Sequence, residues 1–193
     1  IITVLVKLSS KGPVFYKQER VSLDGTRFTI YKFRTMRIDA EVDGPQWSRR
    51  VDARVTALGR FLRRYNLDEL PQLFNVLRAE MSLVGPRPCT PHEFARYQPG
   101  QRERVNAPPG LTGYWQVNGK NNTTFSRMIE MDIHYSKTMS LGMDLSIMLR
   151  TLPAIAMQVL ESRTVRSKRS RIKSILKEHF AQLRRKISRG RRI

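Results

Sequence analysis

The first part of the chain shows an alternation of apolar and polar residues that predicts a β-hairpin. Two runs rich in β-branched and aromatic residues, 14–21 and 26–33, flank Leu23-Asp24-Gly25. An Asp-Gly pair between such runs favours a tight turn, because both residues tolerate a positive φ. Lys11-Gly12-Pro13 predicts a further turn just before the first run.

Helical spacing follows the hairpin. Thr56 suits the N-cap of a helix over residues 56–65, and a second helix is expected just downstream. Because Pro71 fits only the first helical turn, Asp68 is expected as the N-cap of that second helix and Glu69 in its first turn, at the positive end of the helix dipole. Its apolar residues follow the i, i+3, i+4, i+7 pattern: Leu70, Leu73, Phe74 and Leu77.

The second half of the chain alternates between an irregular span and helices. Residues 82–122 are rich in glycine and proline, and such a span is costly to order unless it builds a site. Residues 124–137 predict a helix. A longer one, over 141–160, has one apolar face and is expected to kink or restart at Pro153.

Composition places the chain among globular proteins with one domain. Its length is 193 residues and its hydrophobic fraction 40%. The single cysteine, Cys89, excludes an intramolecular disulfide and is interpreted as a small, partly buried apolar residue. The histidines do not follow zinc-ligand spacings. We expect that no stretch reaches the roughly 20 apolar residues needed to span a bilayer.

Charge is unusually positive and unevenly distributed. The net charge is +20, of which +12 falls in residues 163–193 and +8 in the rest. A basic body with a very basic tail indicates an anionic partner: nucleic acid, anionic lipid or a phosphorylated substrate. The tail also has apolar residues at helical spacing, which fits either an amphipathic helix on a membrane surface or a disordered segment.

The chain opens on an apolar run, Ile1 to Leu8, without a methionine. This run is interpreted as the end of a longer apolar segment. Its β-branched residues would also suit a β-strand.

The adjacent acids Asp68 and Glu69 are the first candidates for chemistry. An acid pair at a helix start is usually only a cap. Here Arg60, Arg63 and Arg64 precede it, and Arg87 stands between two prolines. Rigid arginines suit phosphate recognition, and carboxylates among them stay ionised, so one acid could attack phosphorus and the other hold Mg²⁺.

Other polar residues have both a structural and a functional interpretation. Lys32 and Arg34 could form an ordinary solvated strand end. Asp132 and Asp144 are isolated acids in helical surroundings, where a surface position or a helix cap is the ordinary role. Residues 109–120 combine glycines for close backbone approach, aromatic rings, amides and a final lysine, Lys120.

Five motifs in order carry a resemblance to a known family: Gly12-Pro13-Val14-Phe15, Lys32-Phe33-Arg34-Thr35-Met36, Leu67-Asp68-Glu69-Leu70-Pro71-Gln72-Leu73-Phe74-Asn75-Val76-Leu77, Met81-Ser82-Leu83-Val84-Gly85-Pro86-Arg87-Pro88, and Pro109-Gly110-Leu111-Thr112-Gly113 through Gln116-Val117-Asn118-Gly119. Over about residues 10 to 160 the chain resembles the bacterial sugar transferases, the monotopic polyprenyl-phosphate phosphoglycosyl transferases.

The resemblance implies a reaction and a site. Members transfer a sugar 1-phosphate from a UDP-sugar to undecaprenyl phosphate and release UMP, through an aspartyl-phosphosugar intermediate. On that pattern Asp68 is the nucleophile, and Glu69 holds Mg²⁺ together with Asp68. The resemblance assigns substrate or phosphate contacts to seven further residues: Lys32, Arg34, Arg63, Arg87, Lys120, Asp132 and Asp144. At Lys120 relatives often have arginine, so bidentate geometry is lost there.

The chain departs from the family pattern at both ends. Relatives have a re-entrant membrane helix before the hairpin, of which residues 1–8 are interpreted as a remnant. The transferase domain then covers residues 9–162, and the basic tail covers 163–193. Each Lys or Arg of that tail could add about 1 kcal/mol of attraction to an anionic leaflet.

The expected architecture is therefore α+β: a small β-hairpin packed with several helices, some amphipathic and lying on the membrane surface. The expected location is the cytoplasmic face of the bacterial inner membrane, with no specific nucleic acid as partner. Two alternatives stay open, a basic nucleic-acid-binding protein and an inactive truncated scaffold of a glycan-assembly complex. The sequence names neither the sugar nor the oligomeric state, and a homo-oligomer is among the options.

Overall fold

The structure, a computed structural model, describes residues 1–40, 52–119 and 123–160. The chain divides into two compact units, Ile1–Ile155 and Ala156–Ile193. Residues 39–52 are polar and hold Gly44-Pro45, which predicts a loop. Most of that loop and the basic tail lie outside the described residues, so the predictions made for them stay predictions.

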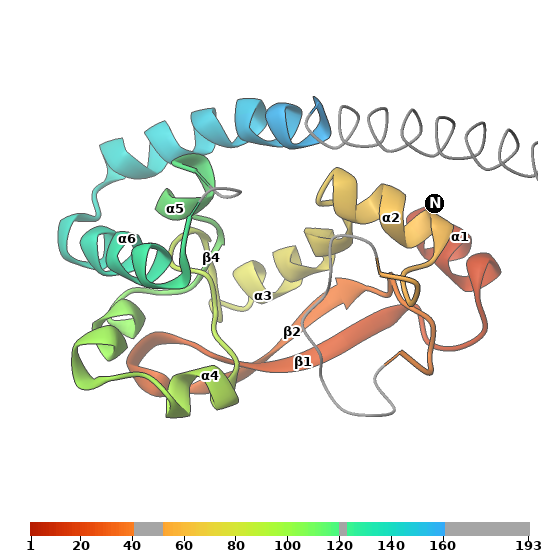
Figure 1. The fold of residues 1–193 in the computed structure, drawn as a ribbon, viewed down its shortest axis with the longest axis horizontal. Coiled ribbons are helices and arrows are strands. Elements are labelled where there is room, and N and C mark those ends of the chain that lie inside the picture. Colours follow the sequence, from red (N-terminus) through yellow and green to blue (C-terminus); the bar gives the residue numbers. More distant parts are fainter. Residues whose placement is uncertain (41–51, 120–122, 161–193) are drawn as a thin grey trace, which may run out of the picture. The chain divides into compact units, whose positions relative to one another are not determined.

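The first unit mixes helices with two small sheets, which confirms the α+β class (Figure 1). Its strands are β1 (Phe15–Val21), β2 (Arg27–Phe33), β3 (Ser82–Val84) and β4 (Gly110–Thr112). Its α-helices are α1 (Ile2–Ser9), α2 (Ala57–Arg64), α3 (Leu73–Leu77), α4 (Pro91–Ala95), α5 (Tyr114–Val117) and α6 (Phe125–Thr138), and a further helix covers Leu141–Leu160. Three 3₁₀ turns connect them: η1 (Leu23–Gly25), η2 (Leu67–Gln72) and η3 (Pro99–Val105).

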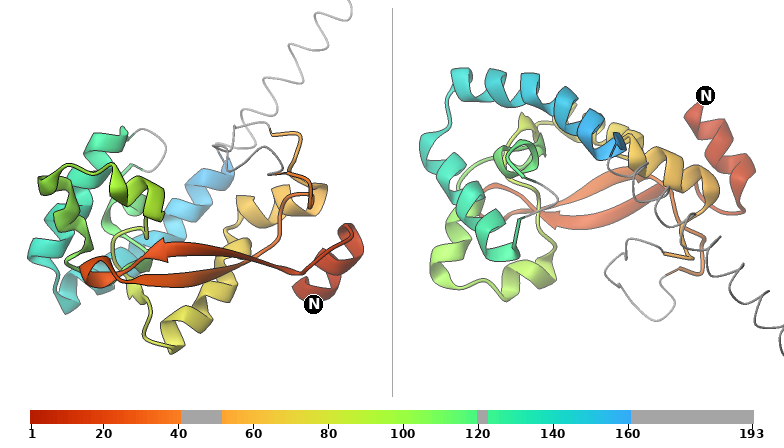
Figure 2. Two further views of the ribbon diagram at one scale, coloured as in Figure 1. Left: turned by 90° about the horizontal axis from the view of Figure 1, so that it is seen from below. Right: turned by 45° about the horizontal axis from the view of Figure 1, so that its top comes forward.

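The predicted hairpin is confirmed. Strands β1 and β2 pair antiparallel from Phe15 opposite Phe33 to Val21 opposite Arg27. The turn between them places Asp24 and Gly25 at φ 55° and 80°, the positive values that an Asp-Gly pair accommodates. Figures 1 and 2 show the turn end of the hairpin near α4 and its open end near α1 and α2.

The edge of β2 is closed by a side chain rather than by a third strand. Asn75 of α3 is fully buried; its amide nitrogen donates to the Thr29 carbonyl at 2.7 Å, and its amide oxygen accepts from the Tyr31 amide at 3.3 Å. An unpaired buried backbone group is costly, so Asn75 replaces the missing ladder partner. This contact fixes the segment η2–α3 along β2, as Figure 1 shows.

The glycine- and proline-rich span folds back on itself through β3 and β4, which pair in parallel. Gly85 and Gly110 make this possible, because a Cβ on Gly110 would lie 2.0 Å from the Gly85 nitrogen. Two apolar clusters hold the span against α6, around Tyr97 with Ile129 and around Val84 with Tyr135. Cys89 belongs to the first cluster, which confirms it as a buried apolar residue.

The predicted helix starts have different outcomes. Thr56 caps α2 as predicted, and Thr124, at the start of the predicted helix 124–137, caps α6; each side chain accepts a backbone N–H group. Asp68 is not an N-cap: it lies inside the 3₁₀ turn η2, and α3 begins only at Leu73. Pro71 has no N–H for an α-helical hydrogen bond, and Asn66 starts the turn in the left-handed region at φ 54°.

Three other expectations are corrected. Residues 2–9 form a helix, not the strand that was the alternative for the first run. The helix Leu141–Leu160 continues through Pro153 without restarting. At 20 residues it is also long and apolar enough to cross a membrane, contrary to the expectation that no stretch is; this rests on length and composition alone.

Candidate active site

The acid pair lies against the end of β2. Asp68 is buried, with 9% of its surface exposed, and Glu69 is half-buried. Glu69 accepts an ion-paired hydrogen bond from the Lys32 ammonium at 2.6 Å. The Asn75 contact along the same strand brings η2 to this position, so two motifs that are far apart in the sequence meet here.

Burial and charge act in opposite directions on Asp68. Desolvation, followed by the neighbouring Glu69 carboxylate, raises the pKa of Asp68 above its ordinary value. The positive charges of Lys32 and Arg63 oppose that rise. A buried acid that two cations help to ionise has a less hydrated, more reactive carboxylate than an exposed one.

Arg63 is oriented by a residue that the sequence did not single out for this role. Its Nε donates to the Thr35 hydroxyl at 2.8 Å, and Thr35 is buried. Thr35 also accepts the Thr56 amide through its carbonyl at 3.0 Å, which fixes the start of α2. The strand end after β2 therefore aims the arginine of α2 toward the acid pair.

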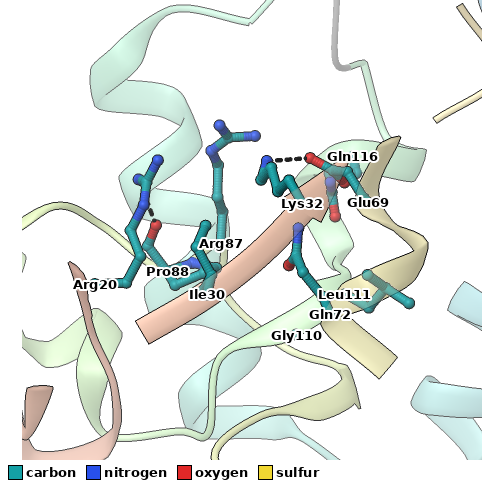
Figure 3. Close-up of a pocket in the computed structure, with 10 residues that line it drawn as sticks. All are labelled: Arg20, Ile30, Lys32, Glu69, Gln72, Arg87, Pro88, Gly110, Leu111 and Gln116. Atoms are coloured by element: carbon teal, nitrogen blue, oxygen red, sulfur yellow. Dashed lines mark hydrogen bonds and ion pairs between the residues drawn. The ribbon is translucent and has the colours of Figure 1, made fainter. Parts of the chain in front are cut away.

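A pocket opens beside the acid pair (Figure 3). It is lined by residues from four of the five motifs and by Arg20 and Ile30 of the hairpin: Arg20, Ile30, Lys32, Glu69, Gln72, Arg87, Pro88, Gly110, Leu111 and Gln116. Three of these residues are cationic and two are amides, with Gln72 almost fully buried. The glycine- and proline-rich span thus builds one wall of the site, as its composition predicts.

Of the predicted set, Lys32, Glu69 and Arg87 line the pocket. Asp68 and Arg63 do not line it, but both lie next to this group, since Glu69, Lys32 and Arg63 all act on the charge of Asp68. Arg34, Asp132 and Asp144 lie elsewhere. Arg34 does not line the pocket; its guanidinium donates to the carbonyls of Ser10 and Lys11 at 2.7 Å each and holds the segment after α1. Lys120 lies outside the described residues.

The two isolated acids also have partners away from the pocket. Asp132 is completely buried and pairs with Arg104, so it has no surface on which to touch a substrate. Burial raises the pKa of Asp132 to about 6, and Arg104 opposes that rise. Asp144 accepts a hydrogen bond from the Tyr135 hydroxyl at 2.7 Å and joins the last described helix to α6.

Sequence reasoning missed several residues of the site. Gln116 stood in a segment chosen for its amides, and Thr35 stood in the second motif without an assigned role, but Arg20 and Arg104 carried no local signal. Arg20 is one cation in an exposed-looking strand, and Arg104 one of several arginines in a polar segment. Their burial follows from contacts with residues up to 68 positions away, as between Arg20 and Pro88.

The donor atoms fit a hard cation that is shared with a phosphorylated ligand. Asp68 and Glu69 provide adjacent carboxylate oxygens, the ligand type that Mg²⁺ prefers. No cluster of three or more His, Cys, Asp or Glu residues occurs within residues 1–40, 52–119 and 123–160. Two carboxylates would suffice here, because Mg²⁺ usually completes its shell with water and substrate phosphates.

Carboxylates beside lysine and arginine in a pocket form a site for an anionic, phosphorylated ligand. Residues 1–158 match the bacterial sugar transferase family, and the chain belongs to that family. The membership confirms the resemblance carried by the five motifs.

Individual relatives agree with this membership. The chain is 44% identical over 165 residues to UDP-glucose:undecaprenyl-phosphate glucose-1-phosphate transferase of Caulobacter vibrioides, covering 80% of this chain and 61% of the relative. It is 38% identical over 173 residues to the exopolysaccharide production protein ExoY of Rhizobium meliloti, covering 81% and 76%. Galactosyl transferase CpsE of Streptococcus agalactiae is 40% identical over 156 residues, covering 75% of this chain but only 35% of the relative.

Proposed function

We propose that this protein transfers a sugar 1-phosphate from a UDP-sugar to undecaprenyl phosphate and releases UMP, as a first step of surface polysaccharide or glycoconjugate assembly. The observation that carries the proposal is Asp68, a buried acid whose charged neighbours Glu69 and Lys32 line a cationic pocket. The names of two relatives support the reaction class, because one is an undecaprenyl-phosphate galactose phosphotransferase and the other a UDP-glucose:undecaprenyl-phosphate glucose-1-phosphate transferase.

In the first step a carboxylate oxygen of Asp68 attacks the phosphorus that bears the sugar. An aspartyl-phosphate bond forms, and the bond from that phosphorus to the bridging oxygen breaks. The electron pair leaves with UMP. Positive charge from Arg87 and Arg63 would stabilise the negative charge that develops on the phosphates.

In the second step a phosphate oxygen of undecaprenyl phosphate attacks the same phosphorus. The aspartyl-phosphate bond breaks, the Asp68 carboxylate is regenerated, and the lipid carries a sugar diphosphate. Splitting the transfer in this way lets UMP leave before the second anion enters, which predicts ping-pong kinetics.

Asp68 and Glu69 would hold Mg²⁺, which when bound offsets phosphate charge and acts as a Lewis acid. Lys32 keeps Glu69 in place and adds a positive charge next to the acid pair. The residues themselves bind and orient the two anionic substrates, which would otherwise repel each other.

Membrane attachment is the second part of the proposal. Large apolar side chains stay exposed on α1, on the segment η2–α3 and on residues 141–152: Val4, Leu5, Leu8, Leu70, Leu73, Phe74, Leu77, Leu141, Leu145, Leu149 and Leu152. Exposed apolar residues on several helices are typical of a protein or membrane interface. With the net charge of +20, they support an anionic membrane at the cytoplasmic face.

Trapping of the covalent intermediate tests the nucleophile. The protein is incubated with Mg²⁺ and UDP-sugars labelled in the sugar phosphate, drawn from glucose, galactose and N-acetylated sugars, then denatured, and retained label is counted. UMP release is followed with undecaprenyl phosphate. We expect Asp68→Asn to lose both signals, by about 10⁴-fold or more for UMP release, as for removal of other catalytic nucleophiles.

The control is Asp24→Asn, which changes an exposed acid in the hairpin turn and keeps a residue that tolerates its positive φ. It should retain label and UMP release at the level of the unsubstituted protein. If Asp68→Asn still traps label from a UDP-sugar, the assignment of the nucleophile is wrong.

A further inference from the structure

A buried ionic cluster is formed by Arg104, Asp132 and Tyr97. None of these three residues lines the pocket. Arg104 is 2% exposed, and its guanidinium pairs with Asp132 and donates to the Tyr97 hydroxyl at 2.6 Å. A buried arginine is costly to desolvate unless its donors are used, and here a carboxylate and a phenol accept two of them.

The remaining contact of the cluster points to the active site. Arg104 Nη2 also donates to the backbone carbonyl of Arg87 at 2.9 Å. Arg87 is one of the two arginines that line the pocket, and in Figure 3 its side chain extends away from Pro88. The cluster therefore holds the backbone of Arg87 by a hydrogen bond, and the guanidinium of Arg87 stays available to the pocket.

The hairpin holds the next two residues of the same segment by hydrogen bonds. Arg20 Nη1 donates to the Pro88 carbonyl at 3.0 Å, and the Val21 amide donates to the Cys89 carbonyl at 2.9 Å. Successive carbonyls of the segment Arg87-Pro88-Cys89 are thus held from both sides. Pro86 and Pro88 restrict φ, so the hydrogen bonds fix a segment that already has few conformations.

From this geometry we infer that Arg104 and Asp132 are positioning residues, which hold the backbone of Arg87 so that its guanidinium meets the anionic substrate. This rests on the proposed function for its catalytic half only. It gives Asp132 a role through Arg104 in place of direct contact with substrate. Displacing a substrate-orienting group by about 1 Å can cost roughly 100-fold in rate, so loss of the hydrogen bond to the Arg87 carbonyl is measurable.

The reactivity of Cys89 can report whether the segment Arg87-Pro88-Cys89 is held in place. Cys89 is the single cysteine, follows Pro88 directly, and is 3% exposed. Burial raises the pKa of its thiol, so it reacts slowly with thiol reagents while the segment is held. The rate at which a thiol reagent modifies Cys89 in the folded protein therefore reports opening of this segment without any engineered label.

The first experiment measures that rate in Asp132→Asn and in the milder Arg104→Lys, which keeps a cation but loses the planar fork that reaches three acceptors. We expect modification of Cys89 to become about tenfold faster in both, with tryptophan fluorescence showing that the proteins stay folded. The control is Asp52→Asn, which removes another acid whose side chain is only 6% exposed and pairs with an arginine, Arg54, at 2.7 Å. It should leave the Cys89 rate unchanged.

The second experiment is a double-mutant cycle on UMP release. Asp132→Asn should lower kcat/KM for the UDP-sugar by about 100-fold in the unsubstituted protein. In an Arg87→Met background the same change should cost less than about threefold, because the group it positions is gone. Asp52→Asn should have the same effect in both backgrounds.

The outcomes separate this inference from the proposed function. If Cys89 reactivity is unchanged in Asp132→Asn and Arg104→Lys, the cluster does not hold the segment Arg87-Pro88-Cys89, and the inference is wrong. Faster reactivity with equal losses in both Arg87 backgrounds shows a general structural role and overturns the positioning of Arg87. If the unsubstituted protein releases no UMP from any UDP-sugar, the proposed function fails, and the Cys89 rates alone then decide whether the cluster holds the segment.

Discussion

At the scale of single residues, two opposing effects act on the carboxyl group of Asp68. It is buried, which favours its protonated form, and it lies among cations that favour its ionised form. A nucleophile must be ionised to attack. The balance between these effects therefore sets the pH range in which the first step can run.

The rate of the proposed first step, attack by Asp68, should therefore depend on pH. Because the pKa of Asp68 lies above its ordinary value, UMP release should fall on acidification at a higher pH than an exposed aspartate would give. Lys32→Met removes a charge that lowers this pKa, so the acid limb should move to still higher pH. The measurement is kcat/KM against pH for both proteins.

Acidification should change the contribution of Asp68 to the free energy of unfolding in the opposite direction from UMP release. A loss of activity at low pH that comes from titration of Asp68 is thereby distinguished from one that comes from unfolding. Since the pKa of Asp68 is higher in the folded than in the unfolded chain, its contribution to stability is present at low pH and is lost as pH rises through the folded pKa. Lys17→Met, a β1 lysine that contacts Tyr31, is the matched control and should leave the acid limb in place. An acid limb that does not move in Lys32→Met would contradict the assignment.

At the scale of elements, the site depends on how closely α2 approaches the strand end that follows β2. Gly59 in α2 faces the Thr35 carbonyl, and a Cβ there would lie 2.0 Å from that oxygen. Thr35 in turn orients Arg63. The missing side chain of one glycine thus lets a helix set the position of Arg63, the arginine proposed to bind phosphate.

Gly59→Ala should therefore separate these elements. We expect it to lower the free energy of unfolding by about 1–3 kcal/mol, the usual cost of overpacking, and to reduce UMP release by at least about tenfold. Chemical denaturation and the UMP assay measure the two effects. Gly142→Ala is the control, because nothing lies within 4 Å of a Cβ at Gly142; comparable losses in both variants would contradict the role of the close approach.

At the scale of the whole molecule, charge and exposed apolar helices act on the same partner. The net charge of +20 attracts anionic lipid over a distance that salt shortens, whereas apolar contact does not depend on salt. Leu77 of α3 is 83% exposed and Phe74 59%, although both follow the helical spacing that usually marks a buried face. These residues favour a membrane as the missing apolar contact.

Binding to vesicles of phosphatidylglycerol tests both contributions. Raising the salt to about 0.5 M should weaken binding but leave a residual part, because only the electrostatic attraction is screened. Leu77→Asp should reduce that residual part by about tenfold, corresponding to loss of one large apolar contact. The control is Ile38→Asp, an apolar residue that is 70% exposed and lies outside these helices; an equal reduction there would show that α3 has no special part in binding.

The sequence by itself determined the parts that depend on near neighbours. The hairpin, the capped starts of α2 and α6, and the motif around Asp68 and Glu69 follow from turn chemistry, periodicity and motif order. The α+β class and family membership follow from the same signals. All of them are encoded in residues a few positions apart.

Only the tertiary structure decided what the isolated polar residues do. In the sequence, nothing distinguishes Asp132 and Arg34 from the charged residues of the pocket. In the structure, Asp132 is buried in an ion pair with Arg104, and Arg34 donates to the backbone carbonyls that follow α1. Arg20 and Thr35 acquire roles near the site from contacts 68 and 28 positions away. A charged residue's role depends on which distant partners packing brings within hydrogen-bond distance, and local sequence does not specify them.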